Sequence, residues 1–331
     1  MQNAAAQLIA ACDDPGAVAA RLRAEEQAVI RVLGQDAPYA LLRAAVRAPV
    51  RMVPRPGPTP DADTLAGDGT LSQRGRSLLQ QIVADASGTP LLFTHADSEL
   101  PQLFATVRDL IRAGDIAARP IHMLDLAHQP RESSRAYNAA RVAQLVDWLG
   151  GVDAERLAGC AAEERARPAA MQHLSGVLRI AAIGAAHALR PAEWLELVQL
   201  AGDDAAGEPV FVLGSPHFST ARARDLAARG LEAKSDDQDW GDPLVAGWAE
   251  SPATLVGLSD PMRLVPRKLL PATERAAAAT ARMQALGIAR AIIVESVGDE
   301  AAAWDAGYFA HTLESAGFAV ERIGAPPPPA P

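Results

Sequence analysis

The chain has little cysteine, almost no lysine and no excess of positive charge. Its 331 residues include two cysteines, Cys12 and Cys160, which are too few for a disulfide framework or for a zinc site of their own. Lysine occurs only at Lys234 and Lys268, and the formal net charge is −9. A basic surface of the kind that binds nucleic acid is therefore not expected.

The sequence also lacks long apolar runs and several common signatures. No stretch approaches the roughly 18 apolar residues that suggest a membrane span. The first segment, MQNAAAQLIAACDDPG, has no basic start of a signal peptide, so a cytoplasmic protein without a membrane partner is expected. No GxxxxGK(S/T), GxGxxG, GxSxG or HExxH string occurs. This argues against P-loop ATP hydrolysis, a Rossmann dinucleotide fingerprint and metalloprotease chemistry.

What the sequence does contain is an alternation of short apolar runs and amphipathic stretches. Strands are predicted near 50–53, 90–94 and 121–124, and again near 209–213, 231–235, 290–295 and 318–323. Helices are predicted near 71–86 and 95–112, and later near 219–229, 270–286 and 300–316. This alternation is typical of parallel sheets with helical crossovers. The sequence therefore predicts an α/β protein with two Rossmann-like parallel-sheet units.

The remaining segments complete the expected domain organisation. Residues 3–33 have a helical pattern with a break at Asp13-Asp14-Pro15, residues 54–69 predict a loop, and residues 134–200 predict helices without a strand. The end, PPPPAP, predicts an extended, disordered tail. We expect N-terminal helices at 1–48, a first α/β unit at 49–133, a helical connector at 134–206, a second α/β unit at 207–325 and the tail at 326–331.

Polar turns follow two predicted strands of the second unit, where open α/β sheets bind ligands. In the turn Gly214-Ser215-Pro216-His217, backbone N–H groups and the Ser215 hydroxyl could meet a phosphate or thioester oxygen, or the turn could only cap a helix. The acidic loop 236–239 lacks the ligand spacing of a calcium loop, so a solvated turn is the simpler interpretation. Trp240 could stack on a flat ligand or close the core.

Two further turns carry titratable side chains. After the strand at 90–94, His95 could bind a substrate carbonyl or carry a proton, while Asp97 or Ser98 could simply cap the next helix. After the strand at 290–295, Glu295 could do acid–base work with Asp299 or Glu300, or these acids could be structural, as first-turn acids of the next helix are. The predicted catalytic residues are thus His95 and Glu295. The predicted substrate-binding residues are Ser98, Gly214, Ser215, His217 and Trp240, and no metal ligand is predicted.

Several segments, taken in order, resemble the 2-hydroxyacyl-CoA dehydratase and benzoyl-CoA reductase subunits. In the first unit these are GQDAPYALLRAAVRAPVRM and FTHADSELPQLFATVRDLI. The middle region contributes DLAHQPRESSRAYNAARVAQLVDWLGG and MQHLSGVLRIAAI. In the second unit, VFVLGSP, SDDQDWGDP and GDEAAAWDAGYFAHTLESAGF are similar to the family in type and order. The resemblance covers most of residues 30–323.

This resemblance implies an enzyme of two subunits that acts on an acyl-CoA. In the family, a heterodimer binds the thioester in a cleft, and three cysteines at strand ends hold an iron–sulfur cluster. An ATP-dependent activator supplies one electron, and a ketyl radical forms at the thioester carbonyl. The resemblance places the cleft of this chain between its two α/β units, lined by His95, Ser98, Ser215, His217 and Trp240.

The sequence departs from the family at the cluster. The three cysteines would fall in the loop before residue 71, beside Asp97, and among or after residues 237–262, and none is present there. A cluster of this family needs three thiolates that converge on one point, whereas Cys12 and Cys160 lie on predicted helices. The chain is therefore expected to bind no cofactor itself, and a [4Fe–4S] cluster would belong to a partner subunit.

Three interpretations of the function stay open. The chain could be a lyase subunit that binds an acyl-CoA or supports a cluster-bearing partner. It could be a non-catalytic structural or assembly subunit. It could also be a cluster-independent enzyme that uses His95 or Glu295 for acid–base chemistry. The expected partner is a homologous cysteine-bearing subunit or a second copy of the chain.

Overall fold

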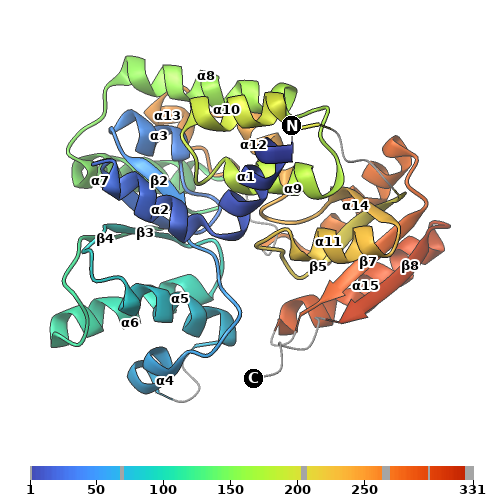
Figure 1. The fold of residues 1–331 in the computed structure, drawn as a ribbon, viewed down its shortest axis with the longest axis horizontal. Coiled ribbons are helices and arrows are strands. Elements are labelled where there is room, and N and C mark those ends of the chain that lie inside the picture. Colours follow the sequence, from blue (N-terminus) through green and yellow to red (C-terminus); the bar gives the residue numbers. More distant parts are fainter. Residues whose placement is uncertain (1, 68–70, 203–206, 263–268, 297–298, 325–331) are drawn as a thin grey trace.

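The computed structural model describes residues 2–67, 71–202, 207–262, 269–296 and 299–324. The fold is α/β with two four-stranded sheets in which all paired strands are parallel, as the sequence predicts. Sheet A contains β1 (Val29–Leu33), β2 (Ala48–Arg51), β3 (Leu91–Thr94) and β4 (Ile121–Leu124). Sheet B contains β5 (Glu208–Gly214), β6 (Leu231–Asp236), β7 (Arg290–Glu295) and β8 (Ala319–Gly324). The orders β2-β1-β3-β4 and β6-β5-β7-β8 share one connection pattern (Figure 1).

Helices flank both sheets and fill the region between them (Figure 1). Around sheet A lie α2 (Pro15–Ala24), α3 (Tyr39–Ala44), α4 (Pro60–Ala66), α5 (Gln73–Ala84), α6 (Glu99–Ala113) and α7 (Glu132–Leu149). Around sheet B lie α11 (Ala221–Ala228), α14 (Ala272–Leu286) and α15 (Glu300–Ser315). The others are α1 (Gln2–Asp13), α8 (Ala154–Ala170), α9 (Gly176–Ala185), α10 (Pro191–Leu200), α12 (Asp242–Ala249) and α13 (Leu255–Leu258).

Side-chain alternation along the inner strands builds separate apolar cores on the two faces of each sheet. On β1, Ile30 and Val32 pack with side chains of α3 and α7, whereas Leu33 packs with α5 and α6. On β5, Phe211 packs with α14 and α15, whereas Val212 belongs to the core on the side of α11. Strands that are covered on both faces are expected to be mostly apolar, and both inner strands largely follow this rule.

A further apolar cluster joins the two units. It combines side chains of α1, α9, α10 and α12 with Val29 and Val50 of sheet A. At the end of β2, Arg51 donates hydrogen bonds to the carbonyl oxygens of Cys12 at 2.8 Å and of Phe218 at 3.1 Å. The N-terminal helix and the connector therefore fix sheet A against the second unit.

Some local predictions are wrong. The helix expected over 3–33 ends earlier, because Val29–Leu33 forms β1, an inner strand that pairs with both β2 and β3. The segment 1–48 thus contributes a strand to the first unit, as well as helices. A short apolar run cannot be assigned to helix or strand by periodicity alone, and no turn residue separates this one from the helical pattern before it. The loop predicted over 54–69 contains α4, and α12 was not predicted.

The predicted tail, 326–331, lies outside the described residues. Within the described part, no helix combines the length and apolarity that crossing a membrane would need.

Candidate functional site

The shared strand order makes positions in the two sheets comparable. Gly34, just after β1, and Gly214, at the end of β5, both have positive φ, +113° and +93°. Aligning the sheets at these glycines matches β3 with β7 through the pairing registers. The residue that follows β3, His95, then corresponds to Glu295 at the end of β7. The two predicted catalytic residues therefore occupy the same position in the two units.

In sheet A, His95 belongs to a hydrogen-bonded group that is open to solvent. Its Nδ1 lies 2.8 Å from Oδ1 of Asp125, the residue directly after β4. The other oxygen, Oδ2, accepts a 2.5 Å hydrogen bond from the Tyr137 hydroxyl on α7. The His95 side chain is 47% exposed. Burial opposes ionisation of Asp125, but the hydrogen bonds from Tyr137 and His95 outweigh it and lower the pKa of Asp125.

This arrangement has the elements of a proton-transfer group. A carboxylate on Nδ1 fixes the histidine tautomer, so that a neutral His95 carries its proton on Nδ1 and presents the Nε2 lone pair. All three residues lie at the carboxyl edge of sheet A or on α7 beside it, which is where parallel sheets bind ligands. We call His95, Asp125 and Tyr137 the edge triad.

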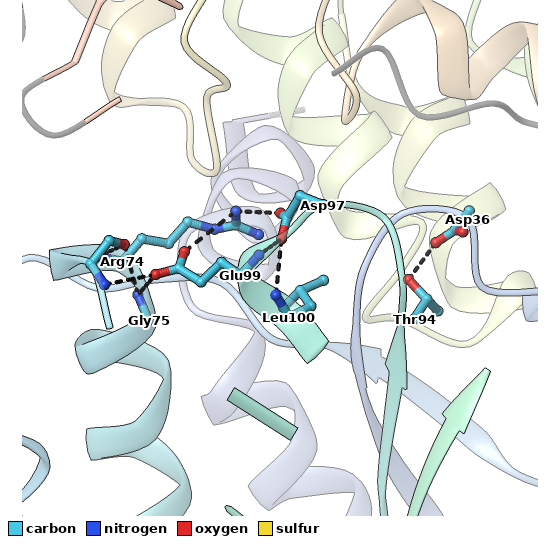
Figure 2. A network of polar contacts seen from close by, with 8 residues as sticks. Asp36, Arg74, Gly75, Thr94, Asp97, Glu99 and Leu100 are labelled. Atoms are coloured by element: carbon cyan, nitrogen blue, oxygen red, sulfur yellow. Dashed lines mark hydrogen bonds and ion pairs between the residues drawn. The ribbon is translucent and has the colours of Figure 1, made fainter. Parts of the chain in front are cut away.

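Next to the edge triad lies a buried polar layer at the same sheet edge. The Thr94 hydroxyl donates a hydrogen bond to Asp36, which follows β1, and Figure 2 shows the two side chains pointing toward one another. Nε2 of His128, in the segment after β4, lies 3.4 Å from Oδ2 of Asp36. Asp36 is fully buried. Polar side chains therefore lie at the end of β3 and in the segments that follow β1 and β4.

The turn after His95 has a structural role. Oδ1 of Asp97 accepts hydrogen bonds at 3.0 Å from the backbone N–H groups of Glu99 and Leu100, which caps α6. Arg74 holds the other Asp97 oxygen (Figure 2). The Arg74 guanidinium also lies over the ring of Phe218, 5.4 Å from its centroid. Of the two predicted capping residues, Asp97 is therefore the cap.

Ser98 makes no side-chain cap and is exposed at the start of α6. Its predicted role in substrate binding stays a prediction. The Glu99 carboxylate reaches α5, where its Oε1 accepts hydrogen bonds from the backbone N–H groups of Ser72 and Gly75 at the start of the helix. The carboxylates of this turn thus fix the two helices on this side of sheet A.

At the corresponding position in sheet B, Glu295 is held by an arginine. The Arg322 side chain on β8 donates two hydrogen bonds to the Glu295 carboxylate, at 2.7 and 2.8 Å. The hydrogen bond from Arg322 lowers the pKa of Glu295. The neighbour on β8 is Gly324, where sheet A has Asp125. Among the described residues, sheet B therefore has no counterpart of the edge triad.

The predicted binding turn after β5 is largely engaged within the protein. A Cβ on Gly214 would lie 2.2 Å from the Val294 carbonyl oxygen, so the glycine lets β5 approach β7. The Ser215 hydroxyl accepts a 2.9 Å hydrogen bond from the backbone N–H of Ser296. His217 is 9% exposed, burial lowers its pKa, and its Nε2 has no hydrogen-bond partner among the described residues. The substrate-binding roles predicted for Gly214, Ser215 and His217 stay predictions.

The loop after β6 is buried, so the solvated turn predicted for it is wrong. Residues 236–239 are each at most 9% exposed. Asp236 accepts hydrogen bonds at 3.0 Å from the backbone N–H groups of Gln238 and Asp242, and Asp237 pairs with Arg275 at 2.8 Å. Trp240 is 5% exposed and packs in the cluster that joins the units. This matches the core-closing alternative for the indole.

The cysteines do not fit the cluster that the resemblance implies. Cys12 lies on α1 with its Sγ 3.3 Å from Arg51 Nη2 and 3.8 Å from the Ile180 carbonyl oxygen, and burial raises its pKa. Cys160 lies within α8, and burial raises its pKa as well. Neither residue follows a strand. Across the described residues, no group of three or more His, Cys, Asp or Glu side chains is placed to hold a metal ion.

The polar residues that the sequence analysis missed are Asp36, Asp125, His128 and Tyr137. Asp125 could have been found, because it directly follows the strand predicted at 121–124, and strand ends are the expected place for site residues. Asp36 was hidden by the wrong helix over 3–33. Tyr137 lies on a helix, and only the packing of α7 beside β4 brings it to the site.

Comparison of the sequence with protein-family models and with curated proteins gives no match in either case.

Proposed function

We propose that the protein is a subunit of the 2-hydroxyacyl-CoA dehydratase type that binds an acyl-CoA without a cluster of its own. In this proposal His95 transfers a proton at the bound thioester. The observation that carries it is the edge triad, in which Nδ1 of His95 lies 2.8 Å from Asp125 and the side chain stays 47% exposed. The fold of two parallel-sheet units agrees with the expected scaffold.

In this proposal each member of the edge triad has a distinct role. His95 accepts a proton on Nε2 from the carbon beside the thioester carbonyl, or returns one to it. Asp125 orients the imidazole and stabilises the imidazolium that forms. Tyr137, which donates to the second oxygen of Asp125, keeps the carboxylate in place. The ketyl radical chemistry of the family is not part of the proposal, since the cysteines do not fit a cluster.

Two measurements test the proposal. The first is titration of the purified protein with acetyl-CoA and longer acyl-CoA thioesters by calorimetry. The second is exchange of the α-hydrogens of the bound thioester for deuterium in heavy water, followed by NMR. We expect His95→Ala to slow the exchange by about 100-fold or more, the usual contribution of a general base, with little change in thioester affinity.

The matched control is His311→Ala, which removes an exposed histidine on α15. It should leave both binding and exchange unchanged. Absence of any heat or thermal shift with all thioesters would contradict acyl-CoA binding. Undiminished exchange in His95→Ala would remove His95 from the mechanism while leaving the binding proposal intact.

A second candidate function, support of a cysteine-bearing partner subunit, is favoured by the outer surface of α15. Trp304 is 85% exposed and Tyr308, one turn later, is 42% exposed. Large aromatic side chains are enriched in protein interfaces. Co-purification with a homologous cysteine-bearing subunit, followed by iron analysis, tests this candidate. It predicts a complex that carries iron and that Trp304→Ala weakens, whereas stoichiometric iron in the lone chain contradicts it.

A further inference from the structure

A charged hollow lies on one face of sheet A, between α2 and α5. Its volume is about 410 Å³. Three arginines from three segments line it: Arg23 in the last turn of α2, Arg31 in the middle of β1 and Arg55 after β2. Asp14 and Asp85 line it as well. The hollow shares no residue with the edge triad, and Arg31 lies within the strand, before the carboxyl edge.

Arg31 is buried in this hollow, and two of its three side-chain nitrogens lack an acceptor among the described residues. The residue is 7% exposed, and within the part of the chain that the structure describes neither Nε nor Nη2 has a hydrogen-bond partner. Both nearby carboxylates have other partners: Asp14 caps α2 and pairs with Arg55, and Oδ2 of Asp85 lies 3.8 Å from Arg23. The hollow therefore contains a buried guanidinium group, and the carboxylates that line the hollow with it are already engaged.

The fold itself gives no reason for an arginine at this position. Its register partners on the two sides, Val50 and Leu91, are apolar and belong to the adjoining apolar clusters. The corresponding residue in sheet B is Phe211, which is 2% exposed and packs in a core. Burying an unpaired charge is unfavourable unless another group compensates it. Burial lowers the pKa of Arg31 to about 10, so the side chain is still charged near neutral pH.

We propose that this hollow, the Arg31 pocket, binds a phosphate group. Three guanidinium groups face two carboxylates, so the lining carries an excess of positive charge. Gly16, in the first turn of α2, also lines the pocket, and the positive end of a helix dipole favours anions. The planar fork of a guanidinium matches a phosphate better than a point charge does. The inference goes beyond the proposed function and does not depend on it.

Calorimetric titration at low ionic strength tests the pocket, with inorganic phosphate and adenosine 5′-monophosphate as separate probes. The wild-type protein is expected to bind at least one of them saturably. Arg31→Met should weaken that binding by about tenfold or more, as expected for loss of a charge-assisted contact. The matched control, Arg112→Met, changes an arginine on α6 whose side chain is 71% exposed, and it should bind as the wild type does.

The two probes separate the sources of the phosphate group. Binding of inorganic phosphate alone identifies the free ion, whereas tighter or exclusive binding of the nucleotide identifies a phosphate carried by a larger ligand. If Arg31→Met does not fold, Arg55→Gln at the rim, whose side chain is 43% exposed in the wild type, replaces it and should also weaken binding. The proposal is overturned if neither probe binds the wild type, or if the variant that folds binds as the wild type does.

Discussion

The residues that end β3 and β7 stand at the same place in two sheets of one topology, yet their surroundings differ. After β3, His95 is half exposed and pairs with a carboxylate that also accepts from Tyr137. At the end of β7, Glu295 is held by two hydrogen bonds from Arg322. The first arrangement leaves a ring nitrogen available to a ligand, whereas the second engages both carboxylate oxygens.

The neighbouring polar groups show the same difference only in part, because Asp36 and Thr94 at the edge of sheet A are buried. Around sheet B, Asp237 pairs with Arg275 in the interior, and the Ser215 hydroxyl accepts from the backbone after β7. Around sheet A, the titratable groups of the edge triad reach the surface. One strand order therefore accommodates two arrangements of polar side chains at the carboxyl edge, and the two arrangements differ in the partners of those side chains.

The largest expected effect is on stability, at the buried ion pair of sheet B. Asp237→Ala would leave Arg275 buried, with the 3.3 Å contact to Asp305 as its remaining ion pair among the described residues. Removing one partner of a buried pair typically costs about 3–5 kcal/mol. Urea unfolding should show this loss for Asp237→Ala, while Asp125→Ala in sheet A costs less than about 1 kcal/mol because its pair is exposed. Equal losses of unfolding free energy in the two variants would contradict the view that the ion pair of sheet B is structural and the exposed pair of sheet A is not.

The next largest effect on stability is expected for two glycines, Gly34 just after β1 and Gly214 at the end of β5. A Cβ at Gly214 would meet the backbone oxygen of Val294 at 2.2 Å, whereas one at Gly34 would meet the Thr94 side chain. A side chain can move more easily than a paired strand, and positive φ adds strain in both cases. We expect Gly214→Ala to cost about 3 kcal/mol in urea unfolding, and Gly34→Ala less.

Gly230→Ala is the control for the backbone conformation alone. Gly230 has φ +73°, and nothing lies within 4 Å of an added Cβ. Its substitution should cost about 1 kcal/mol. A loss in Gly214→Ala no larger than in Gly230→Ala would show that the close approach of β5 to β7 is not the constraint.

The sequence was sufficient for most of the strands and for one residue of the edge triad, His95. Apolar runs bounded by turns predict seven of the eight strands, and the strand-end rule points to His95 and to the turn at Gly214. It also points to Glu295, because pattern alone cannot tell an available carboxylate from an engaged one. That difference depends on Arg322, which comes from another strand and is only brought close by folding.

Among the wrong predictions, the failure to predict β1 concealed the most polar residues. Val29–Leu33 follows a helical pattern without an intervening turn signal. The periodicity of its apolar residues therefore could not distinguish a strand from a continued helix. Asp36 and the buried Arg31 were hidden with it, since an arginine in a predicted helix is expected to face solvent. Long-range pairing of β1 with β2 and β3 settles the conformation of this segment, and a local pattern contains no information about such pairing.

A smaller effect is expected in the acid stability of sheet A. The folded pKa of Asp125 is lowered, so its contribution to stability is present above the unfolded pKa of about 3.9 and is lost as pH falls through the folded value. Urea unfolding of the wild type and Asp125→Asn should differ by less than about 1 kcal/mol at pH 6, since the side chain is exposed. The difference should shrink below about pH 4, and growth of the difference on acidification would contradict this assignment.

The smallest effect is expected for Glu295→Gln, which tests the comparison most directly. A general base works best when its pKa lies near the operating pH, and the hydrogen bonds from Arg322 lower the pKa of Glu295 instead. The exchange of thioester α-hydrogens should therefore change by about twofold at most in Glu295→Gln, against about 100-fold in His95→Ala. The same assay under the same conditions compares the two corresponding positions. If the glutamine variant were the slower of the two, the site would belong to sheet B, and the edge triad of sheet A would be an exposed hydrogen-bonded group without a catalytic role.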